Sequence, residues 1–375
     1  MLGDAVSPSV AIIGTRGYPS YYGGFETLVR QLAPYLADHG WDVSVYGRRN
    51  NVAPADADPR VRSILSPGLD SKSASTLTFG MTSTVHAATV KPDVALVMNV
   101  ANGFWIPLLR VRNIPTLVNV DGIEWEREKW GRGARAIFKI GGSLTARYAT
   151  TLVYDSKELG ARWQDLSGRE GIFIPYGGTP QESGEVPDGL SKRKYILMVA
   201  RFVPENTIEP FLDAAETLSE RWTVVIVGSS GYGGGIEDRV TSIARGNNNI
   251  RWYGHLSDDS ILFALWANAG AYFHGHSVGG TNPALVQAMA CGAPIVARDT
   301  VYNREVLGDC AVFTQPDAGS ITHALDSLIS DVALQESLSV DARHRAQDQY
   351  TWSKVCEGYD TALRSHLNEE THGPR

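Results

Sequence analysis

Short runs of apolar residues alternate along this chain with longer stretches of helical periodicity. In the first half the apolar runs lie at 10–14, 42–46, 61–65, 93–98, 115–119 and 150–154. In the second half they lie at 195–199, 222–228, 250–254, 270–275 and 293–297. A parallel strand is buried on both faces and is followed by a crossover helix. The rhythm therefore predicts parallel sheets covered by helices, an α/β fold.

The rhythm pauses in a polar stretch rich in Gly, Pro and Glu at about residues 178–192. A chain of 375 residues also exceeds what one hydrophobic core usually serves. We therefore predict two facing Rossmann-like domains, at 1–180 and 181–350, and a C-terminal helix within 351–375 that crosses back to the first domain. The ligand is expected in the cleft between the domains, beyond the carboxyl ends of the strands.

The composition excludes several classes of protein. A hydrophobic fraction of 43% and a charged fraction of 20% are typical of globular enzymes. A formal net charge of -7 disfavours a nucleic-acid partner. The three cysteines form no CxxC pair, and neither a signal peptide nor an apolar segment of membrane-spanning length is visible. These features predict a cytoplasmic enzyme.

A wide glycine-rich loop follows the first apolar run, at residues 14–24. Gly23 and Gly24 stand at the start of the next helix, followed by Phe25 and Glu26. The loop is not a tight GxGxxG turn, and its bare backbone amides can face an anion or a sugar. The alternative is that the glycines only make a turn and that Glu26 is a favourable charge at a helix N-terminus.

A second Gly-Gly loop lies in the second half, within residues 274–299. Asn282 followed by Pro283 is typical of a helix start with an N-cap and a proline in the first turn. The backbone amides from Gly279 to Ala284 are therefore expected to face a diphosphate or sugar hydroxyls, together with the positive end of the helix dipole. The two nearby histidines, at 274 and 276, are alternatively ordinary core or loop residues.

These motifs resemble those of a known enzyme family. The segment PALVQAMACGAPIVARD at 283–299 and the later NREVLG at 303–308 are similar to the donor-binding region of retaining GT-B glycosyltransferases of family four. The loop GTRGYPSYYGGFETLV, with the segments at 118–132, 200–206 and 274–283, further resembles the branch that transfers rhamnose in cell-surface polysaccharide assembly. The resemblance implies a nucleotide-sugar donor held by the second domain and a saccharide or lipid-linked acceptor over the first.

The resemblance also implies roles for single residues on the donor side. Arg201 matches the arginine that contacts the donor diphosphate, a role suited to a planar, permanently charged group. The usual companion lysine is replaced by Asn206. Gly254, His255 and Leu256 match the segment whose backbone reads the nucleobase. We also expect His276, Gly23 and Gly24 to lie near the donor.

Two family carboxylates are missing from the donor side. The glutamates of the E-x7-E pattern fall at Gly279 and Gln287. The backbone amides of Gly280, Thr281 and Asn282 can still hold the sugar. An amide side chain offers one acceptor where a carboxylate offers two. Gln287 is therefore predicted to suit a deoxyribose better than a ribose, and hence a dTDP-linked donor, most simply dTDP-rhamnose.

The acceptor side and the proton chemistry are predicted from the first domain. Asp121, at the end of a strand, aligns with the histidine or acid that relatives place near the transferred sugar, and Glu124 follows in the same loop. Such a carboxylate can stabilise an oxocarbenium-like sugar or bind the acceptor. We expect further acceptor contacts from Tyr22, Phe25, Glu26 and Trp125. Asp121 is alternatively a loop acid in an Asx-turn, and only an inverting enzyme would need it as a base, because in a retaining enzyme the donor phosphate takes the acceptor's proton.

The sequence predicts no metal ion and no other cofactor. The one D-x-D, at 56–58, lies in a polar, proline-flanked loop, where solvated acids are the simpler interpretation. GT-B enzymes, as the resemblance implies, stabilise the leaving diphosphate with helix dipoles and basic residues.

A basic and apolar stretch at 127–149 predicts contact with the inner face of the plasma membrane. Apolar residues are interleaved there with Arg127, Lys129, Arg132, Arg135, Lys139 and Arg147. The alternative is an ordinary amphipathic surface helix.

Two rival functions also stay open, a nucleotide-sugar epimerase of the same fold and a non-catalytic sugar-nucleotide-binding module.

Overall fold

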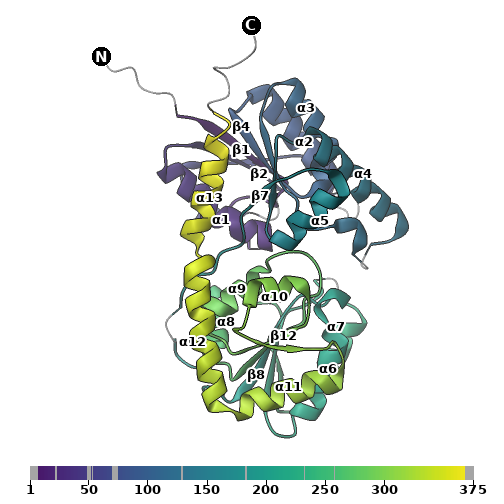
Figure 1. The fold of residues 1–375 in the computed structure, drawn as a ribbon, viewed down its shortest axis with the longest axis vertical. Coiled ribbons are helices and arrows are strands. Elements are labelled where there is room, and N and C mark those ends of the chain that lie inside the picture. The colour runs from purple at the N-terminus through teal and green to yellow at the C-terminus, as the bar shows by residue number, and fades with distance from the viewer. Residues whose placement is uncertain are drawn as a thin grey trace. The chain divides into compact units, whose positions relative to one another are not determined.

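The computed structural model describes residues 7–21, 23–48, 52, 54–69, 75–127, 130–181, 184–231, 233–256 and 258–367. The chain forms two compact units, Met1–Pro175 with Ser353–Arg375, and Tyr176–Trp352 (Figure 1). Residues 176–180, which we predicted in the first domain, begin the second unit. The reason is local: the Gly178 amide donates to the Tyr350 carbonyl at 2.7 Å, within that unit.

The first unit is built on a parallel sheet of seven strands in the order β3-β2-β1-β4-β5-β6-β7. The strands are β1 (Ser9–Ile13), β2 (Asp42–Gly47), β3 (Val61–Leu65), β4 (Val94–Met98), β5 (Thr116–Asn119), β6 (Thr151–Tyr154) and β7 (Ile172–Phe173). Its helices are α1 (Gly24–Asp38), α2 (Ser75–Val90), α3 (Ile106–Val111), α4 (Arg132–Tyr148), α5 (Lys157–Ser167) and, by all but its first residue, α13 (Trp352–Arg364). The strand order reverses between β1 and β4, which is where open α/β sheets bind ligands.

The second unit repeats this plan with six parallel strands in the order β10-β9-β8-β11-β12-β13. The strands are β8 (Tyr195–Val199), β9 (Thr223–Val227), β10 (Ile250–Trp252), β11 (Ala271–His274), β12 (Ile295–Arg298) and β13 (Val312–Thr314). Its helices are α6 (Ile208–Leu218), α7 (Gly235–Gly246), α8 (Asp259–Asn268), α9 (Pro283–Ala290), α10 (Val301–Leu307), α11 (Ala318–Ser330) and α12 (Val332–Gln349). Here the order reverses between β8 and β11.

The apolar runs are continuous because both faces of each central strand are buried. In β8, Tyr195 and Leu197 pack into the core beneath α8 and α9, whereas Ile196 and Met198 pack into the core beneath α6 and α11. Successive strand residues point to opposite faces, so each face of the sheet has its own core.

The predicted fold class is confirmed, since the structure has two parallel sheets covered by helices. The apolar runs coincide with strands to within two residues at each end. We missed β7 and β13, which have two and three residues. Both residues of β7 are exposed and two of the three in β13 are only partly buried, so neither strand presents an apolar run of strand length.

Candidate active site

The strand order of the second unit reverses between β8 and β11, and we call this place the switch point of the unit. The loops that follow these two strands are hydrogen-bonded to each other. The Thr207 hydroxyl donates to the Gly275 carbonyl at 2.6 Å, and the Ser277 amide donates to the Glu205 carbonyl at 2.9 Å. A Cβ added at Gly275 would lie 2.3 Å from the Asn206 carbonyl oxygen, so only glycine allows this approach. The two loops therefore form one bonded rim at the position where ligands bind in such sheets.

Asn206, in the 3-10 turn η4 (Pro204–Asn206), connects this rim to His276. Its Nδ2 donates to the Arg201 carbonyl at 2.7 Å, and its Oδ1 lies 2.6 Å from His276 Nδ1. Because the amide nitrogen is the donor to Arg201, Oδ1 must accept, and His276 carries its proton on Nδ1. We predicted Asn206 as a donor-binding residue, but both polar atoms of its buried side chain are engaged inside the protein.

His276 is also held through its backbone. Asn303, in α10, donates from Nδ2 to the carbonyls of His276 and Arg298, at 2.9 and 2.8 Å. Asn303 is 3% exposed, so its side-chain amide connects these two backbone segments inside the protein. The sequence placed Asn303 in a family motif but carried no signal for this contact.

Arg201 is exposed and follows the end of β8. Its carbonyl accepts from Val203 at 2.9 Å as well as from Asn206, which holds its backbone in place. No acidic side chain among the described residues lies within ion-pair distance of its guanidinium. Arg201 therefore presents a fixed positive charge to solvent on a well-anchored loop.

The loop from Gly279 to Asn282 leads into α9. Gly279 has φ +84°, a left-handed conformation that disfavours any residue with a Cβ, including the glutamate of the family pattern. The Asn282 side chain accepts the Ala284 amide at 3.0 Å, as expected of an N-cap. We predicted that the amides up to Ala284 face a ligand. That range is too long, because the Ala284 amide is capped and Pro283 has no amide hydrogen.

Gln287, in α9, is bonded to the backbone at the start of the unit. Its Oε1 accepts the Thr179 amide at 2.9 Å and its Nε2 donates to the Thr179 carbonyl at 2.8 Å. A carboxylate could accept the first bond but could not donate the second. Both polar atoms of Gln287 are thus engaged within the unit, and its preference for a deoxyribose has no support in this geometry.

The predicted nucleobase segment follows β10. Gly254, at φ +65°, accepts the Gly228 amide at 2.7 Å. His255 is exposed, and Leu256 packs against the core. Gly228 approaches the end of β8 so closely that a Cβ there would lie 1.8 Å from the Ala200 carbonyl oxygen. The segment therefore lies beside the loop that carries Arg201.

His274, at the end of β11, is a core residue. It is 4% exposed, and its Nδ1 lies 3.1 Å from the Tyr272 hydroxyl. Burial lowers the pKa of His274 to about 3. The ring is therefore neutral near pH 7, as the alternative of an ordinary core histidine requires.

In the first unit, the loop after β1 is closed by Glu26. This side chain is 6% exposed, and its Oε1 accepts the Arg16 amide at 2.9 Å. Gly23 is the N-cap of α1 and supplies no side-chain bond, while Gly24 and Phe25 open the helix. We predicted Glu26 on the acceptor side, but the observed bond gives it a structural role. Tyr22 lies outside the described residues.

The loop after β5 contains a buried ionic cluster, which we define as Asp121, Glu124, Arg127 and Trp130. Arg127 Nε lies 2.8 Å from Glu124 Oε1, and its Nη2 donates to the Asp121 carbonyl at 3.1 Å. Trp130 Nε1 donates to Glu124 Oε2 at 3.0 Å. Glu124 is 2% exposed. It therefore holds Arg127 and the loop in place, while Asp121, with a side chain 29% exposed, is the more accessible carboxylate.

Asp121 itself has φ +56°, an unusual conformation for a residue with a side chain. The Asn119 side chain accepts the Asp121 amide at 3.1 Å, so the Asx-turn that we considered for Asp121 belongs to Asn119. Trp125, predicted on the acceptor side, packs edge-on against Trp163 with ring centroids 5.8 Å apart. A Cβ at Gly142 would lie 2.4 Å from the Trp125 ring, so this indole fills space next to α4.

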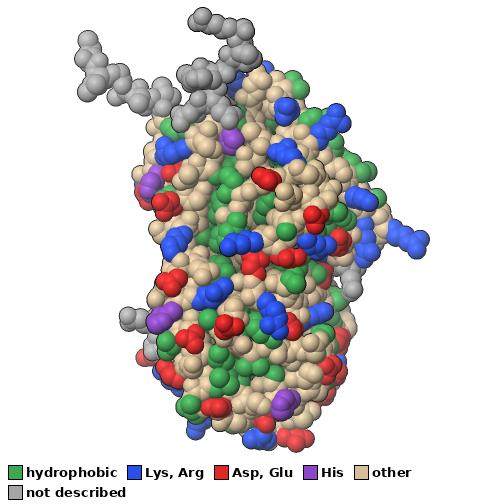
Figure 2. Space-filling view, viewed as in Figure 1, with side chains coloured by type: hydrophobic (Ala, Val, Ile, Leu, Met, Phe, Trp, Pro, Cys, Tyr) green, Lys and Arg blue, Asp and Glu red, His purple; other side chains and the backbone are tan. Residues whose placement is uncertain are grey.

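Helix α4 carries the rest of the basic stretch that we predicted to contact a membrane. Arg132 and Lys139 are exposed, beside Ile137 and Ile140 with exposed fractions of 41% and 52%. Figure 2 shows Lys and Arg side chains at the edge of the first unit where Figure 1 places α4. Arg127 is not part of this surface, because it is buried in the ionic cluster. Among the described helices, none combines the length and apolarity that a membrane span requires.

No cluster of three or more His, Cys, Asp or Glu suited to a metal ion occurs in the parts of the chain that the structure describes. The two acids of the D-x-D are engaged with neighbours. Asp56 accepts from the Tyr21 hydroxyl at 3.0 Å, and Asp58 forms an ion pair with Arg60 at 2.6 Å.

The two units match two known domain families. Residues 23–177 match the Glycosyl transferase 4-like domain, and residues 185–345 match Glycosyl transferases group 1. The chain belongs to the glycosyltransferase family.

The phosphatidyl-myo-inositol mannosyltransferase of Mycobacterium leprae is 31% identical to this glycosyltransferase over 212 residues. That match covers 53% of this chain and 54% of the relative, so this chain spans about half the length of the relative. Among solved structures, sucrose-phosphate synthase from Thermosynechococcus elongatus has a TM-score of 0.82 at 18% identity, covering 97% of this chain and 100% of that one. Anabaena HepE in complex with UDP-glucose has a TM-score of 0.75 at 15% identity, covering 96% and 100%. These similarities confirm the GT-B prediction for the fold.

The structure of this glycosyltransferase thus brings together part of the predicted donor site. Arg201, Asn206 and His276 form one bonded group at the switch point of the second unit. Gln287 does not belong to that group, because its side chain is bonded to Thr179. The residue that sequence reasoning misplaced most clearly is Arg127, whose only signal was its spacing of three residues from Glu124.

Proposed function

We propose that this glycosyltransferase moves a hexose from a nucleoside diphosphate sugar to a saccharide or lipid-linked saccharide, without a metal ion. The observation that carries the proposal is the bonded rim at the β8/β11 switch point, with Arg201 on one loop and the 279–282 loop on the other. A diphosphate suits this rim, since it pairs with guanidinium groups and with backbone amides at a helix start.

Catalysis in this proposal is mostly positioning and leaving-group stabilisation. Arg201 supplies a charge to the departing diphosphate. His276, with its proton on Nδ1 directed to Asn206, occupies the neighbourhood where the family lysine is missing. Asp121 lies on the acceptor-side loop, where its carboxylate can bind the acceptor or stabilise positive charge on the sugar.

For the donor we propose dTDP-rhamnose, on the resemblance of the motifs at 14–29, 118–132, 200–206 and 274–283 to the rhamnose-transferring branch. For the stereochemistry we propose retention, with the donor phosphate taking the acceptor's proton. Asp121 is then a binding residue and not an obligatory base. We also propose that α4 rests on an anionic membrane surface, which suits a lipid-linked acceptor.

The test incubates the purified chain with UDP-glucose, GDP-mannose and dTDP-rhamnose in turn, together with lipid-linked and free saccharide acceptors. Mass spectrometry distinguishes transferred sugar from epimerised donor and from unchanged donor. Transfer supports the proposal, whereas epimerisation or mere binding would establish one of the two rival functions. The anomeric coupling in the NMR spectrum of the product decides between retention and inversion.

A thermal-shift series with UDP, GDP and dTDP ranks the nucleotides independently of the acceptor, because a ligand of the native state raises the melting temperature. The largest shift with dTDP supports the proposed donor. A larger shift with UDP or GDP would replace it while leaving the transferase proposal intact.

A further inference from the structure

An open depression of about 580 Å³ lies on the first unit. Its volume is within the range of small-molecule sites, about 300–1,000 Å³. None of the residues that we propose for donor binding or transfer lines it. It is formed by the loop after β1 with Tyr18, Pro19 and Tyr21, by α1 with Arg30, Gln31 and Pro34, and by the segment 56–60.

One wall of the depression is tied together by Tyr21. Its hydroxyl donates to Asp56 Oδ2 at 3.0 Å, which joins the loop after β1 to the segment before β3. The Arg30 guanidinium lies 4.0 Å from the centroid of the Tyr21 ring, a cation–π contact. Tyr21 is 39% exposed, so the wall remains accessible to solvent.

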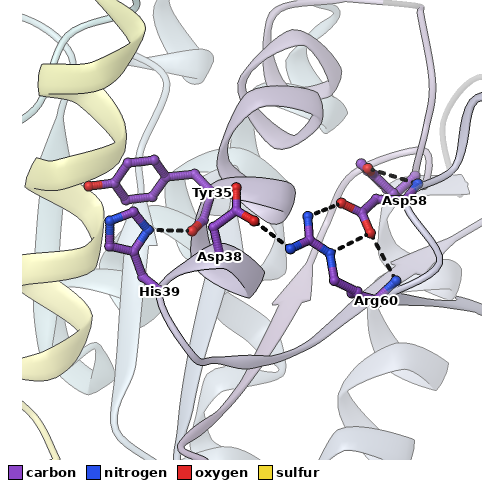
Figure 3. Close-up of polar contacts among 6 residues, drawn as sticks. Tyr35, Asp38, His39, Asp58 and Arg60 are labelled. Atoms are coloured by element: carbon purple, nitrogen blue, oxygen red, sulfur yellow. Dashed lines mark hydrogen bonds and ion pairs between the residues drawn. The ribbon is translucent and has the colours of Figure 1, made fainter.

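Another part of the lining is fixed by Arg60 (Figure 3). Its Nε and Nη2 contact the two oxygens of Asp58 at 3.0 and 2.6 Å, and its Nη1 also contacts Asp38 at the end of α1. These hydrogen bonds lower the pKa of Asp58 to about 2, so the carboxylate is ionised at neutral pH. The planar fork of arginine thereby holds the acceptor oxygens of Asp58 in one orientation.

The lining offers donors and acceptors in near balance. Asp56 and Asp58 contribute negative charges and Arg30 and Arg60 positive ones, so an anion or a cation meets both attraction and repulsion. Gln31 presents one acceptor and one NH₂ donor, while tyrosine and proline faces supply apolar surface. This chemistry fits a ligand that carries many hydroxyl groups and no charge.

We propose that this depression binds a neutral oligosaccharide, as a subsite for the saccharide chain of the acceptor. The proposal rests on the glycosyltransferase function above and adds the acceptor class, a chain of at least two neutral sugars. A chain that occupies the subsite is held at a second place besides the reacting sugar, so longer acceptors bind more tightly than single sugars.

The test uses saturation-transfer NMR on the full chain without donor, with neutral gluco-, manno- and rhamno-oligosaccharides of one to six sugars. We expect binding of at least one series, increasing with chain length. Gln31→Trp fills the depression from an exposed position of α1 and is expected to weaken that binding at least tenfold. Gln164→Trp makes the same change at an exposed position of α5 and serves as the matched control.

Absence of saturation transfer in all three series would overturn the proposal, as would equal binding by Gln31→Trp and Gln164→Trp, or displacement of the bound sugar by inorganic phosphate. Tyr21→Ala opens the other wall and replaces Gln31→Trp if that variant does not fold. With an active donor–acceptor pair, Gln31→Trp should raise KM for long acceptors and leave kcat and the donor KM unchanged. Donor turnover without saccharide binding would refute the subsite alone, whereas binding without turnover would refute the transferase function.

Discussion

The loop after β5 in the first unit and the loops after β8 and β11 in the second are held by different forces. In the first, a buried ion pair between Glu124 and Arg127 organises the loop that carries Asp121. In the second, most bonds of the rim involve backbone groups or an amide side chain, with one further bond from the Arg298 guanidinium to the Thr207 hydroxyl, and the buried His274 is uncharged near pH 7. The loop of the first unit is therefore vulnerable to the loss of one charge, and the loops of the second to changes in backbone shape or protonation.

The largest effect is expected from Arg127→Ala, which leaves Glu124 buried without its ion-pair partner. Removing one member of a buried pair typically costs about 3–5 kcal/mol of unfolding free energy. Urea denaturation measures this loss. The double variant Glu124→Gln/Arg127→Met should recover part of it, because both charges are then absent and the introduced amide oxygen can still accept from Trp130. A double variant no more stable than Arg127→Ala would show that the loop is not organised by this pair.

In the second unit, Arg201→Ala should strongly lower activity while the fold persists, since this residue is exposed. Loss of one preorganised group is worth about 2–4 kcal/mol of transition-state stabilisation, or roughly a 30- to 1,000-fold fall in kcat. Initial rates of nucleotide diphosphate release measure it. Arg221→Ala, an exposed arginine of the same unit bonded to Asp326, is the matched control. Near-wild-type turnover in Arg201→Ala would contradict the assignment.

His274 gives the second unit a stability term that depends on pH. In the unfolded chain a histidine protonates below about pH 6.5, whereas folded His274 stays neutral down to about pH 3. The unfolded state then binds more protons, so stability falls as pH falls through this window, by about 2 kcal/mol between pH 7 and pH 5. His274→Phe should flatten this part of the pH profile, whatever its effect at pH 7. Urea denaturation at pH 7, 6 and 5 measures how the free energy of unfolding changes with pH. The same change in wild type and His274→Phe would be evidence against a neutral buried ring.

A smaller effect is expected at the membrane-facing surface proposed for α4. Replacing Arg132, Arg135 and Lys139 by Gln should weaken sedimentation with anionic vesicles several-fold, as each basic residue near such a surface contributes about 1 kcal/mol. A control of equal charge change replaces Lys192, Lys194 and Arg221, which are exposed on the second unit. Equal weakening by both triple variants would mean that net charge, and not α4, governs the binding.

No effect at all is expected from chelation. Transfer activity should survive excess EDTA, because the proposed leaving-group stabilisation uses Arg201 and backbone amides. Restoration of lost activity by Mg²⁺ or Mn²⁺ would show that a cation takes part. A metal ion would then supply charge that we assign to Arg201 and the backbone amides of the second unit.

Much of the fold could be predicted from single runs of residues, and the site only in part. Strands such as β3 and β8 were located to the residue because their apolar runs are continuous. The rim could be predicted as two loops, at 200–206 and 274–283, but not as one bonded structure. The contact between Asn206 and His276 joins residues 70 positions apart, and nothing in either segment specifies it.

By itself the sequence determined the α/β class, the tandem of two units and the family. A strand that is buried on both faces must be a continuous run of apolar residues, and such a run is visible in the sequence. Tertiary structure alone decided which polar residues are engaged with each other. In the sequence Arg127 is one of several basic residues, but in the structure it is a buried partner of Glu124. Gln287 is predicted from the sequence to bind a deoxyribose, but its side chain is bonded to Thr179. Pairing of polar atoms depends on distances between elements, and those distances are set by how the helices pack on the sheets and not by the order of residues within any one segment.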